Sequence, residues 1–197
     1  MSGPDGKLFI ISGPSGAGKS TVLRRVLETS PVPVRLSVSA TTRLPRPGEV
    51  HGRDYYFLTD KEFQRRLANG EFLEAKEVYG QGKWYGTLWD EVRSGWDAGE
   101  AVILEIDVEG AMSVIPKVPN AVTIFLHPGS PAELERRLRA RKTESDAEIA
   151  RRLEVARREL EKLPLYQYEV INDDVDRAAE EICGILERET RPAEGTT

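Results

Sequence analysis

The sequence predicts an α/β protein with a doubly wound parallel sheet at its core. Three short apolar runs, at 7–12, 101–107 and 121–126, have the length and composition of buried strands. Segments with apolar residues at helical spacing follow, for example at 20–29 and near 131–141. Strands that are apolar on both sides and alternate with helices are typical of a parallel sheet covered by helices on both faces.

The C-terminal half of the chain continues the alternation of strands and helices. After the apolar run at 121–126, helical patterns cover 131–141 and 145–163. A further apolar run at 168–171 precedes a helical pattern at 175–189. We expect these segments to supply a last strand and helix of the same core.

The stretch 37–97 differs in composition from its surroundings. It is rich in Arg, Gly, Pro and aromatic residues, and its apolar segments are short and alternating, as at 54–58. Short alternation is typical of half-buried strands. The sequence therefore predicts an inserted α+β subdomain between two parts of the core, 1–36 and 98–189, with a flexible tail at 190–197.

Composition restricts the class of protein. Hydrophobic residues are 39% and charged residues 31% of the chain, a globular balance. The net charge of −5 argues against a nucleic-acid partner. No apolar run approaches the roughly 20 residues that span a bilayer and no signal-peptide pattern is present, so we expect a cytoplasmic protein without a membrane partner. Cys183 is the single cysteine, which excludes an internal disulfide.

A phosphate-binding motif lies between the first predicted strand and helix. Residues 13–20 fit the pattern G-x-x-x-x-G-K-[ST]. Its glycines allow backbone N–H groups to turn inward around a phosphate, ahead of the positive end of a helix dipole. The sequence therefore predicts a P-loop NTPase-type core that binds a nucleoside triphosphate, but the loop does not identify the acceptor. The predicted ATP-binding residues in this segment are Gly13, Pro14, Ser15, Gly16, Ala17, Gly18, Lys19, Ser20 and Thr21.

A second motif, at 37–49, reads Ser-Val-Ser-Ala-Thr-Thr-Arg-Leu-Pro-Arg-Pro-Gly-Glu and resembles the signature of the guanylate kinase family. Arg43 and Arg46 in this motif could grip one phosphate with two planar guanidinium groups, although two solvated surface arginines would also fit the segment alone. The resemblance covers nearly the whole chain. It continues in family order through residues 52–57, 72–74, 84–87, 105–110 and 170–174.

The resemblance implies an ATP:GMP phosphotransferase with a GMP-binding subdomain at 37–97 and a helical lid at about 131–155. It implies that Asn172 contacts the adenine side of the ATP site. The implied GMP-binding residues are Ser39, Arg43, Arg46, Glu49, Tyr55, Glu74, Tyr85, Thr87, Glu105 and Asp107. Within this set, the phosphate would be held by Arg43, Arg46, Tyr55 and Tyr85, and guanine by Ser39, Glu74 and Thr87.

Glu74 is the residue on which the choice of guanine would depend. Guanine presents N1–H and an amino group as adjacent donors, which one carboxylate can accept together. Adenine presents an acceptor at N1 and would be repelled, so selection would act by mismatch. From the residues alone, Glu74 would be a surface carboxylate at a strand end, and the family resemblance reverses that interpretation.

The expected reaction needs alignment and charge neutralisation rather than a base. A phosphomonoester is mostly dianionic at pH 7 because its second pKa is about 6. The barrier is the approach of two polyanions, which cations in a closed site would lower. The predicted catalytic residues are Lys19 of the phosphate loop and Arg43 of the second motif, together with Arg137, Arg141 and Arg152, which the resemblance to the family's lid implies. The other arginines near the lid would pair with glutamates at helical spacing.

Magnesium is the expected cofactor, with ATP as co-substrate. The predicted metal residues are Ser20 and Asp107, of which Asp107 would orient the ion directly or through water. Glu105 stands where the family pattern leads us to expect Asp, which lengthens its reach by a methylene. The turn at 79–85 is also longer than the usual family turn, and Lys142 stands where the lid often has Gly.

Two other functions remain open from the sequence. A non-catalytic guanylate kinase-like interaction module would not need the intact phosphate loop and arginines. A nucleoside monophosphate kinase with a different acceptor would be consistent with Glu105 and the longer turn. The oligomeric state, monomer or homodimer, does not follow from the sequence.

Overall fold

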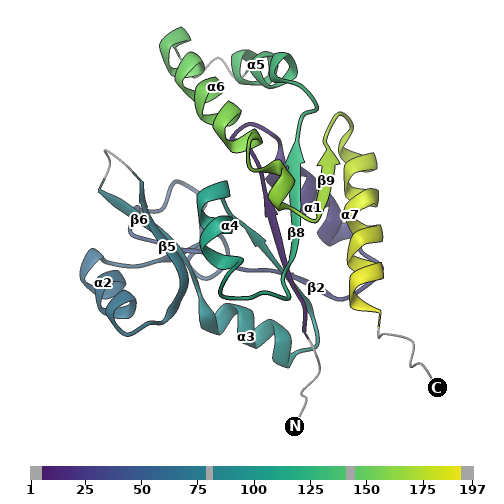
Figure 1. The fold of residues 1–197 in the computed structure, drawn as a ribbon. Helices are drawn as coiled ribbons and strands as arrows, with labels where there is room; N and C mark the ends of the chain where they lie inside the picture. The colour runs from purple at the N-terminus through teal and green to yellow at the C-terminus, as the bar shows by residue number, and fades with distance from the viewer. Residues whose placement is uncertain (1–5, 79–81, 141–144, 192–197) are drawn as a thin grey trace, which may run out of the picture.

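The computed structural model describes residues 6–78, 82–140 and 145–191 (Figure 1). Its larger sheet has five parallel strands in the order β2-β7-β1-β8-β9. The carboxyl ends of parallel strands lie at one edge of the sheet, which is where ligands bind in such folds. The strands are β1 (Leu8–Ser12), β2 (Val34–Leu36), β7 (Ala101–Glu105), β8 (Val122–His127) and β9 (Tyr168–Ile171).

Helices cover both faces of this sheet. The central strand β1 sends Phe9 and Ile11 to one face and Leu8 and Ile10 to the other, as the period of two in a strand requires. The first face packs against α1 (Lys19–Thr29) and α7 (Val175–Thr190), and the second against α3 (Trp89–Asp97) and α4 (Val108–Val114).

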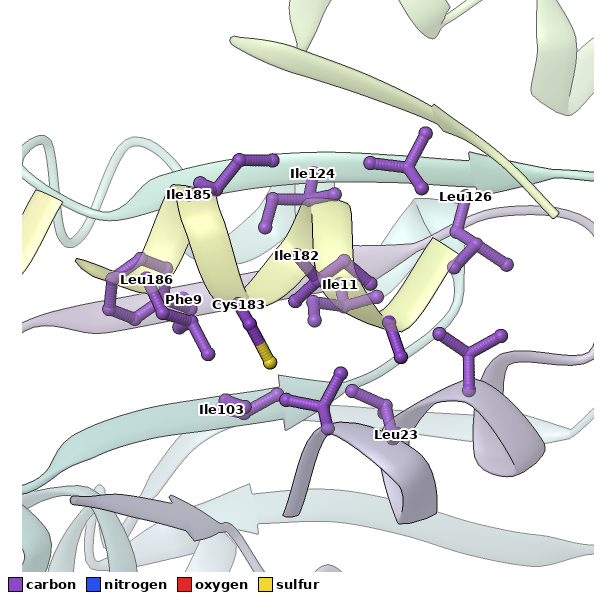
Figure 2. Close-up of a cluster of buried hydrophobic side chains, with 14 of the residues drawn as sticks. Phe9, Ile11, Leu23, Ile103, Ile124, Leu126, Ile182, Cys183, Ile185 and Leu186 are labelled. Carbon is purple, nitrogen blue, oxygen red and sulfur yellow. The ribbon is translucent and has the colours of Figure 1, made fainter. Parts of the chain in front are cut away.

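The larger core cluster lies between the sheet and the helices α1 and α7. Figure 2 shows side chains of β1, β7 and β8 meeting those of the two helices. Cys183 is one of these buried residues, and its sulfur lies 3.8 Å from the hydroxyl of Thr29 on α1. Its position in α7 agrees with a packing role.

A second, four-stranded sheet lies within the inserted segment. Its order is β4-β3-β6-β5, with β6 antiparallel to both neighbours. The helix α2 (Asp60–Ala68) covers it, and the rings of Phe63 and Phe72 stack with centroids 4.4 Å apart. The strands are β3 (Ala40–Thr41), β4 (Tyr56–Phe57), β5 (Phe72–Val78) and β6 (Lys83–Leu88).

Two helices, α5 (Pro131–Ala140) and α6 (Asp146–Leu160), pack on each other beside the carboxyl edge of the larger sheet (Figure 1). Ser145 and Glu148 form a capping box that begins α6. A short 3-10 helix, η1 (Leu163–Leu165), follows α6 and leads to β9.

The predicted α/β class with a doubly wound parallel sheet is confirmed, including the mixed sheet of an inserted segment. The helix expected at 145–163 ends earlier, at Leu160, because Pro164 cannot donate an α-helical hydrogen bond and the chain tightens into η1. The strand expected at 121–126 begins at Val122, since the N–H of Ala121 closes a turn onto Val118. None of the helices in the described ranges combines the length and apolarity needed to cross a membrane.

Replacing Ile124 by Ala is expected to lower the free energy of unfolding by about 2–5 kcal/mol, the usual cost of a cavity in a packed core. Ile124 is 0% exposed in the middle of β8. Urea denaturation monitored by circular dichroism measures the change. As a control, Leu165→Ala removes a side chain that is 59% exposed and is expected to cost about 0.5 kcal/mol or less. Equal losses in the two variants would contradict the described core.

Candidate functional site

The phosphate loop, residues 13–20, joins the end of β1 to the start of α1. Gly13, Gly16 and Gly18 have φ values of 146°, 96° and 87°, which favour glycine. A Cβ on Gly13 would lie 2.0 Å from the carbonyl oxygen of Leu126, so no side chain fits there. The loop therefore adopts a backbone path that its glycines make possible, with the N-terminus of α1 behind it.

Lys19 is half-buried at the floor of the site. Its Nζ donates to the carbonyl oxygens of Gly13 at 2.6 Å and Pro14 at 3.2 Å. Burial lowers the pKa of Lys19, and the nearby carboxylates of Glu105, Glu159 and Asp107 oppose that shift. The ammonium group is thus held inside the loop, in a cavity with acidic neighbours.

Ser20 and Glu105 meet next to Lys19. The parallel register pairs Ile11 of β1 with Glu105 of β7, which brings the end of β7 beside the loop. The hydroxyl of Ser20 donates to Oε1 of Glu105 at 2.6 Å. A hydroxyl and a carboxylate oxygen are hard donors of the kind that Mg²⁺ prefers. In the described part of the chain, no three His, Cys, Asp or Glu side chains form a metal-binding group.

Asp107 lies just beyond β7 and is already engaged through both carboxylate oxygens. Its Oδ1 accepts from the N–H of Gly110 at 2.7 Å and caps α4. Its Oδ2 accepts from Nζ of Lys76 at 3.0 Å, and the same ammonium also contacts Glu109. The metal role predicted for Asp107 stays a prediction, and in this structure the carboxylate hydrogen-bonded to Ser20 is Glu105.

The arginine motif lies at the edge of the inserted sheet. Arg43 donates through Nη1 and Nη2 to the two oxygens of Glu49, at 2.8 and 2.9 Å. This pairing with Arg43 lowers the pKa of Glu49 to about 2. The guanidinium of Arg43 lies 5.2 Å from the ring centroid of Tyr55, and the rings of Tyr55 and Tyr85 are 6.1 Å apart. Arg46 is exposed, and its backbone N–H donates to Glu49 at 2.6 Å.

Glu74 and Thr87 face each other across β5 and β6. Both are buried, with exposed fractions of 8% and 1%. The hydroxyl of Thr87 donates to Oε1 of Glu74 at 2.9 Å, and burial raises the pKa of Glu74. A carboxylate in this position can select a ligand with paired donors. Its burial contrasts with the exposed strand end that the residues alone suggested.

Two adjoining cavities connect the phosphate loop to the inserted sheet. One, of about 680 Å³, contains Lys19 and Ser20, and the other, of about 490 Å³, contains Glu74 and Tyr85. The residues that line both are Ser15, Ser39, Tyr55, Lys76, Glu105, Ile106 and Asp107. The structure thus brings about half of the predicted ATP- and GMP-binding residues to the lining of one continuous region, while Arg43, Arg46, Glu49, Thr87 and Asn172 lie outside that lining.

The α5–α6 pair reaches the back of the phosphate loop. Arg137 donates to the carbonyl oxygens of Asn172 at 2.6 Å and Ala17 at 3.4 Å. The side-chain Nδ2 of Asn172 also donates to the carbonyl oxygen of Ala17 at 2.7 Å. Arg152 donates to the hydroxyl of Ser15 at 3.5 Å. Arg141 and Lys142 lie outside the described residues, as does the 79–81 part of the long turn.

Two residues of the site were not singled out from the sequence. Lys76 contacts Asp107 and Glu109, and Glu159 lines the larger cavity from α6. Lys76 could have been noticed because it lies two positions after Glu74 and so shares its face of a strand. Glu159 lies seven residues after Arg152, which places both on one face of a helix.

Comparisons with known proteins agree on one family. The guanylate kinase family model matches residues 5–189. A guanylate kinase of Rhodopirellula baltica is 57% identical over 190 residues, 95% of this chain and 91% of that protein. A guanylate kinase of Rubrobacter xylanophilus is 48% identical, with 93% and 94% covered. The crystal structure of guanylate kinase from Anaplasma phagocytophilum has a TM-score of 0.73 at 31% identity, covering 96% of this chain and 89% of that one.

Replacing Glu159 by Gln is expected to raise the melting temperature at pH 8 and to change it little at pH 4. Burial raises the pKa of Glu159 from 4.5 to about 7, so between these values the folded state keeps a proton that the unfolded state releases. The stability contributed by the protonated carboxyl is therefore present at low pH and lost as the pH rises through about 7. Gln resembles the protonated form at every pH.

Thermal unfolding at the two pH values measures this effect in the wild type, Glu159→Gln and a control, Glu161→Gln. Glu161 is exposed two residues further on, so its replacement is expected to have little effect at either pH. If Glu159→Gln changed the melting temperature by the same amount at pH 4 and pH 8, the Glu159 carboxyl would have the same pKa in the folded and unfolded states, which would contradict the prediction.

Proposed function

Because the chain belongs to the guanylate kinase family and is therefore a nucleoside monophosphate kinase, we propose that it catalyses ATP + GMP = ADP + GDP. The proposal includes direct in-line transfer of the γ-phosphoryl group, a requirement for Mg²⁺, and a place in cytoplasmic purine nucleotide metabolism. The observation that carries it is the continuity of the two cavities, which join the phosphate loop to the buried Glu74.

The donor nucleotide would occupy the phosphate loop. Lys19 would turn from the carbonyl oxygens of Gly13 and Pro14 to the β- and γ-phosphates, which are stronger acceptors because they are charged. Asn172 would contact the adenine. Its Oδ1 is buried and accepts no hydrogen bond from the described residues, so an amino group of the ligand would satisfy it.

The acceptor phosphate would bind between the arginine motif and the two tyrosines. Arg43 is already oriented by Glu49 and by the ring of Tyr55, so its guanidinium group is held near the position where a phosphate would bind. Arg46 would contribute a second guanidinium group, and Tyr85 would donate a hydrogen bond from its hydroxyl. Glu49 would thus act by holding Arg43, although the family resemblance assigned it to GMP itself.

Guanine would bind in the cavity that contains Glu74. One oxygen of Glu74 accepts from Thr87, which fixes the plane of the carboxylate, and the group faces a cavity shared with Ser39 and Tyr85. Paired donors at N1 and the 2-amino group would suit the carboxylate. Adenine would place a lone pair against it in a buried position, where an unmatched polar contact is costly.

Ser20 and Glu105 fit the requirements of Mg²⁺. They place two oxygen donors 2.6 Å apart at the entrance to α1, beside the expected position of the β- and γ-phosphates. Mg²⁺ usually takes one or two protein ligands together with phosphate oxygens and waters. Bound there, the ion would neutralise charge that develops between the phosphates. Asp107 would act mainly on the acceptor side, next to Lys76.

Transfer would depend on positioning rather than on a general base. An oxygen of the GMP phosphate is already anionic and would attack in line with the leaving oxygen. Lys19, Arg43, Arg137, Arg141 and Arg152 would neutralise the phosphates as the site closes. We propose that the α5–α6 pair acts as the lid and that the segment 37–97 binds GMP, both closing over the core.

The two alternative functions are less consistent with these contacts. An interaction module has no physical need for a cation held inside an intact phosphate loop. A different acceptor was suggested by Glu105, but Glu105 is hydrogen-bonded to Ser20 on the donor side. The extra methylene of Glu105 would therefore affect Mg²⁺ binding next to Ser20 more than recognition of the acceptor base.

An acceptor panel tests the proposed function directly. With MgATP, GMP is expected to be converted to GDP, whereas AMP should react with a kcat/KM lower by a factor on the order of 10⁴, because a buried carboxylate would be left mismatched. CMP and UMP are also expected to be poor acceptors. A coupled assay of ADP release measures all four. Equal turnover with AMP and GMP would rule out the role given to Glu74.

Replacing Lys19 by Ala is expected to lower kcat roughly 100- to 1000-fold, the range for removing a group that stabilises transition-state charge. GMP binding, measured by calorimetry without ATP, should change little because Lys19 would contact donor phosphates. The matched control is Lys61→Ala, which removes an exposed lysine of α2. Normal turnover in Lys19→Ala would overturn the proposed mechanism.

A further inference from the structure

The helix α6 turns one face toward the phosphate loop. Arg152, Val155 and Glu159 recur every three or four residues and so share that face. Arg152 contacts Ser15, while Val155 and Glu159 line the larger cavity together with Lys19. This arrangement adds a carboxylate from α6 to a cavity that already contains the ammonium group of Lys19 and the carboxylates of Glu105 and Asp107. Unless a cation balanced it, this further negative charge would repel phosphates.

Glu159 is half-buried among charged groups from several elements. Lys19 lies on the phosphate-loop side, Asp107 and Glu109 on the side of α4, and Lys76 on β5. Its Oε2 is fully buried and accepts no hydrogen bond from the residues that the structure describes. A buried carboxylate without a hydrogen bond is costly to the fold, so its presence calls for a role in the site.

Lys19 is the cation best suited to balance this carboxylate. Three carboxylates attract its ammonium group: Glu105 most strongly, then Glu159, then Asp107. Glu105 accepts from Ser20, and Asp107 accepts from Gly110 and Lys76. An ammonium group has three N–H donors, of which two are directed to carbonyl oxygens here. Asp107 is thus engaged through both oxygens and Glu105 through Oε1, whereas Oε2 of Glu159 is buried and accepts no hydrogen bond from the described residues. Of the three carboxylates, Glu159 is therefore the one with a buried oxygen that lacks a hydrogen bond in the described chain.

Glu159 also acts electrostatically on Tyr166, near the end of β1. The hydroxyl oxygens of Tyr166 and Ser12 are buried there and have no hydrogen-bond partner within the described chain. Burial raises the pKa of Tyr166 to about 12, with an opposing effect from Ser12 and a reinforcing one from Glu159. Ser12 is the last residue of β1 and directly precedes Gly13. The three groups therefore form a polar cluster between the end of α6 and the start of the loop.

We propose that Glu159 is a positioning residue for phosphoryl transfer, whose carboxylate steers the ammonium group of Lys19 and so links the lid helix α6 to the phosphate loop. The proposal rests on the role given above to Lys19 at the donor phosphates. Glu159 touches neither nucleotide in this account and acts through Lys19. Its charge, rather than its size, is what the reaction requires.

Three substitutions separate charge from size. Glu159→Asp keeps the charge and shortens the side chain, Glu159→Gln keeps the size without the charge, and Glu159→Ala removes both. The assay is run at pH 8, above the pKa of about 7 that burial gives Glu159, so that the wild-type carboxyl is charged. Removing this charged partner is expected to lower kcat roughly tenfold in the Gln and Ala variants, with a smaller loss in Asp. The KM for GMP should stay near the wild-type value. Glu161→Gln, at an exposed position, is the matched control and should retain wild-type kcat.

The decisive measurement repeats Glu159→Gln in the Lys19→Ala background. A residue that acts through Lys19 should cause no further loss there, whereas independent effects would multiply. Thermal melts verify that each variant is folded, and if Glu159→Gln does not fold, Glu159→Asp against Glu159→Ala makes the same comparison. Wild-type kcat in Glu159→Gln, or a full further loss in the double variant, would overturn the proposal. Normal turnover in Lys19→Ala alone would overturn the role of Lys19 on which this proposal rests, whereas failure of the wild type to phosphorylate GMP would overturn the proposed function.

Discussion

The position of the phosphate loop depends on the close approach of Gly13 to the backbone of β8. A Cβ at Gly13 would lie 2.0 Å from the carbonyl oxygen of Leu126, so the loop packs directly on the neighbouring strand. The pairing of Ser12 with Phe125 holds the two strands in register at that point. Lys19 then lies inside the loop rather than outside it. The other charged groups of the site are arranged around this ammonium and the helix N-terminus beside it.

Two cations of the site are paired with carboxylates: Arg43 with Glu49, and Lys76 with Asp107. Lys19 lies among acidic groups and, within the described residues, donates to carbonyl oxygens instead of forming a salt bridge. Substrate phosphates would therefore replace carboxylates or carbonyl oxygens as partners rather than meet bare cations. Such an exchange adds less affinity than a new ion pair would, but it keeps the guanidinium and ammonium groups oriented for incoming phosphates.

The sequence predicted the parts of this structure that local patterns determine. The apolar runs and the phosphate-loop motif predicted the parallel sheet and the turn at its carboxyl edge, since strand burial and glycine spacing are local properties. The hydrogen bond between Ser20 and Glu105, which are 85 residues apart, depends on the register of β1 with β7, which no local pattern specifies. The contact of Lys76 with Asp107 likewise joins the inserted sheet to the core. Neither contact could be predicted from the sequence, because each depends on how distant segments pack together and not on the type of residue alone.

Burial of Glu74 connects the inserted sheet to the choice of base. Burial raises the pKa of this carboxyl, which means that removing it from water has already weakened its hydration before a ligand arrives. Thr87 satisfies one oxygen at 2.9 Å and fixes the orientation of the other lone pairs. A base with adjacent donors would restore the missing hydrogen bonds and favour the charged form. A base with an acceptor at the same place would leave a buried carboxylate facing a lone pair. Discrimination between the two bases would therefore depend on the burial of the Glu74 carboxylate from water as much as on the carboxylate itself.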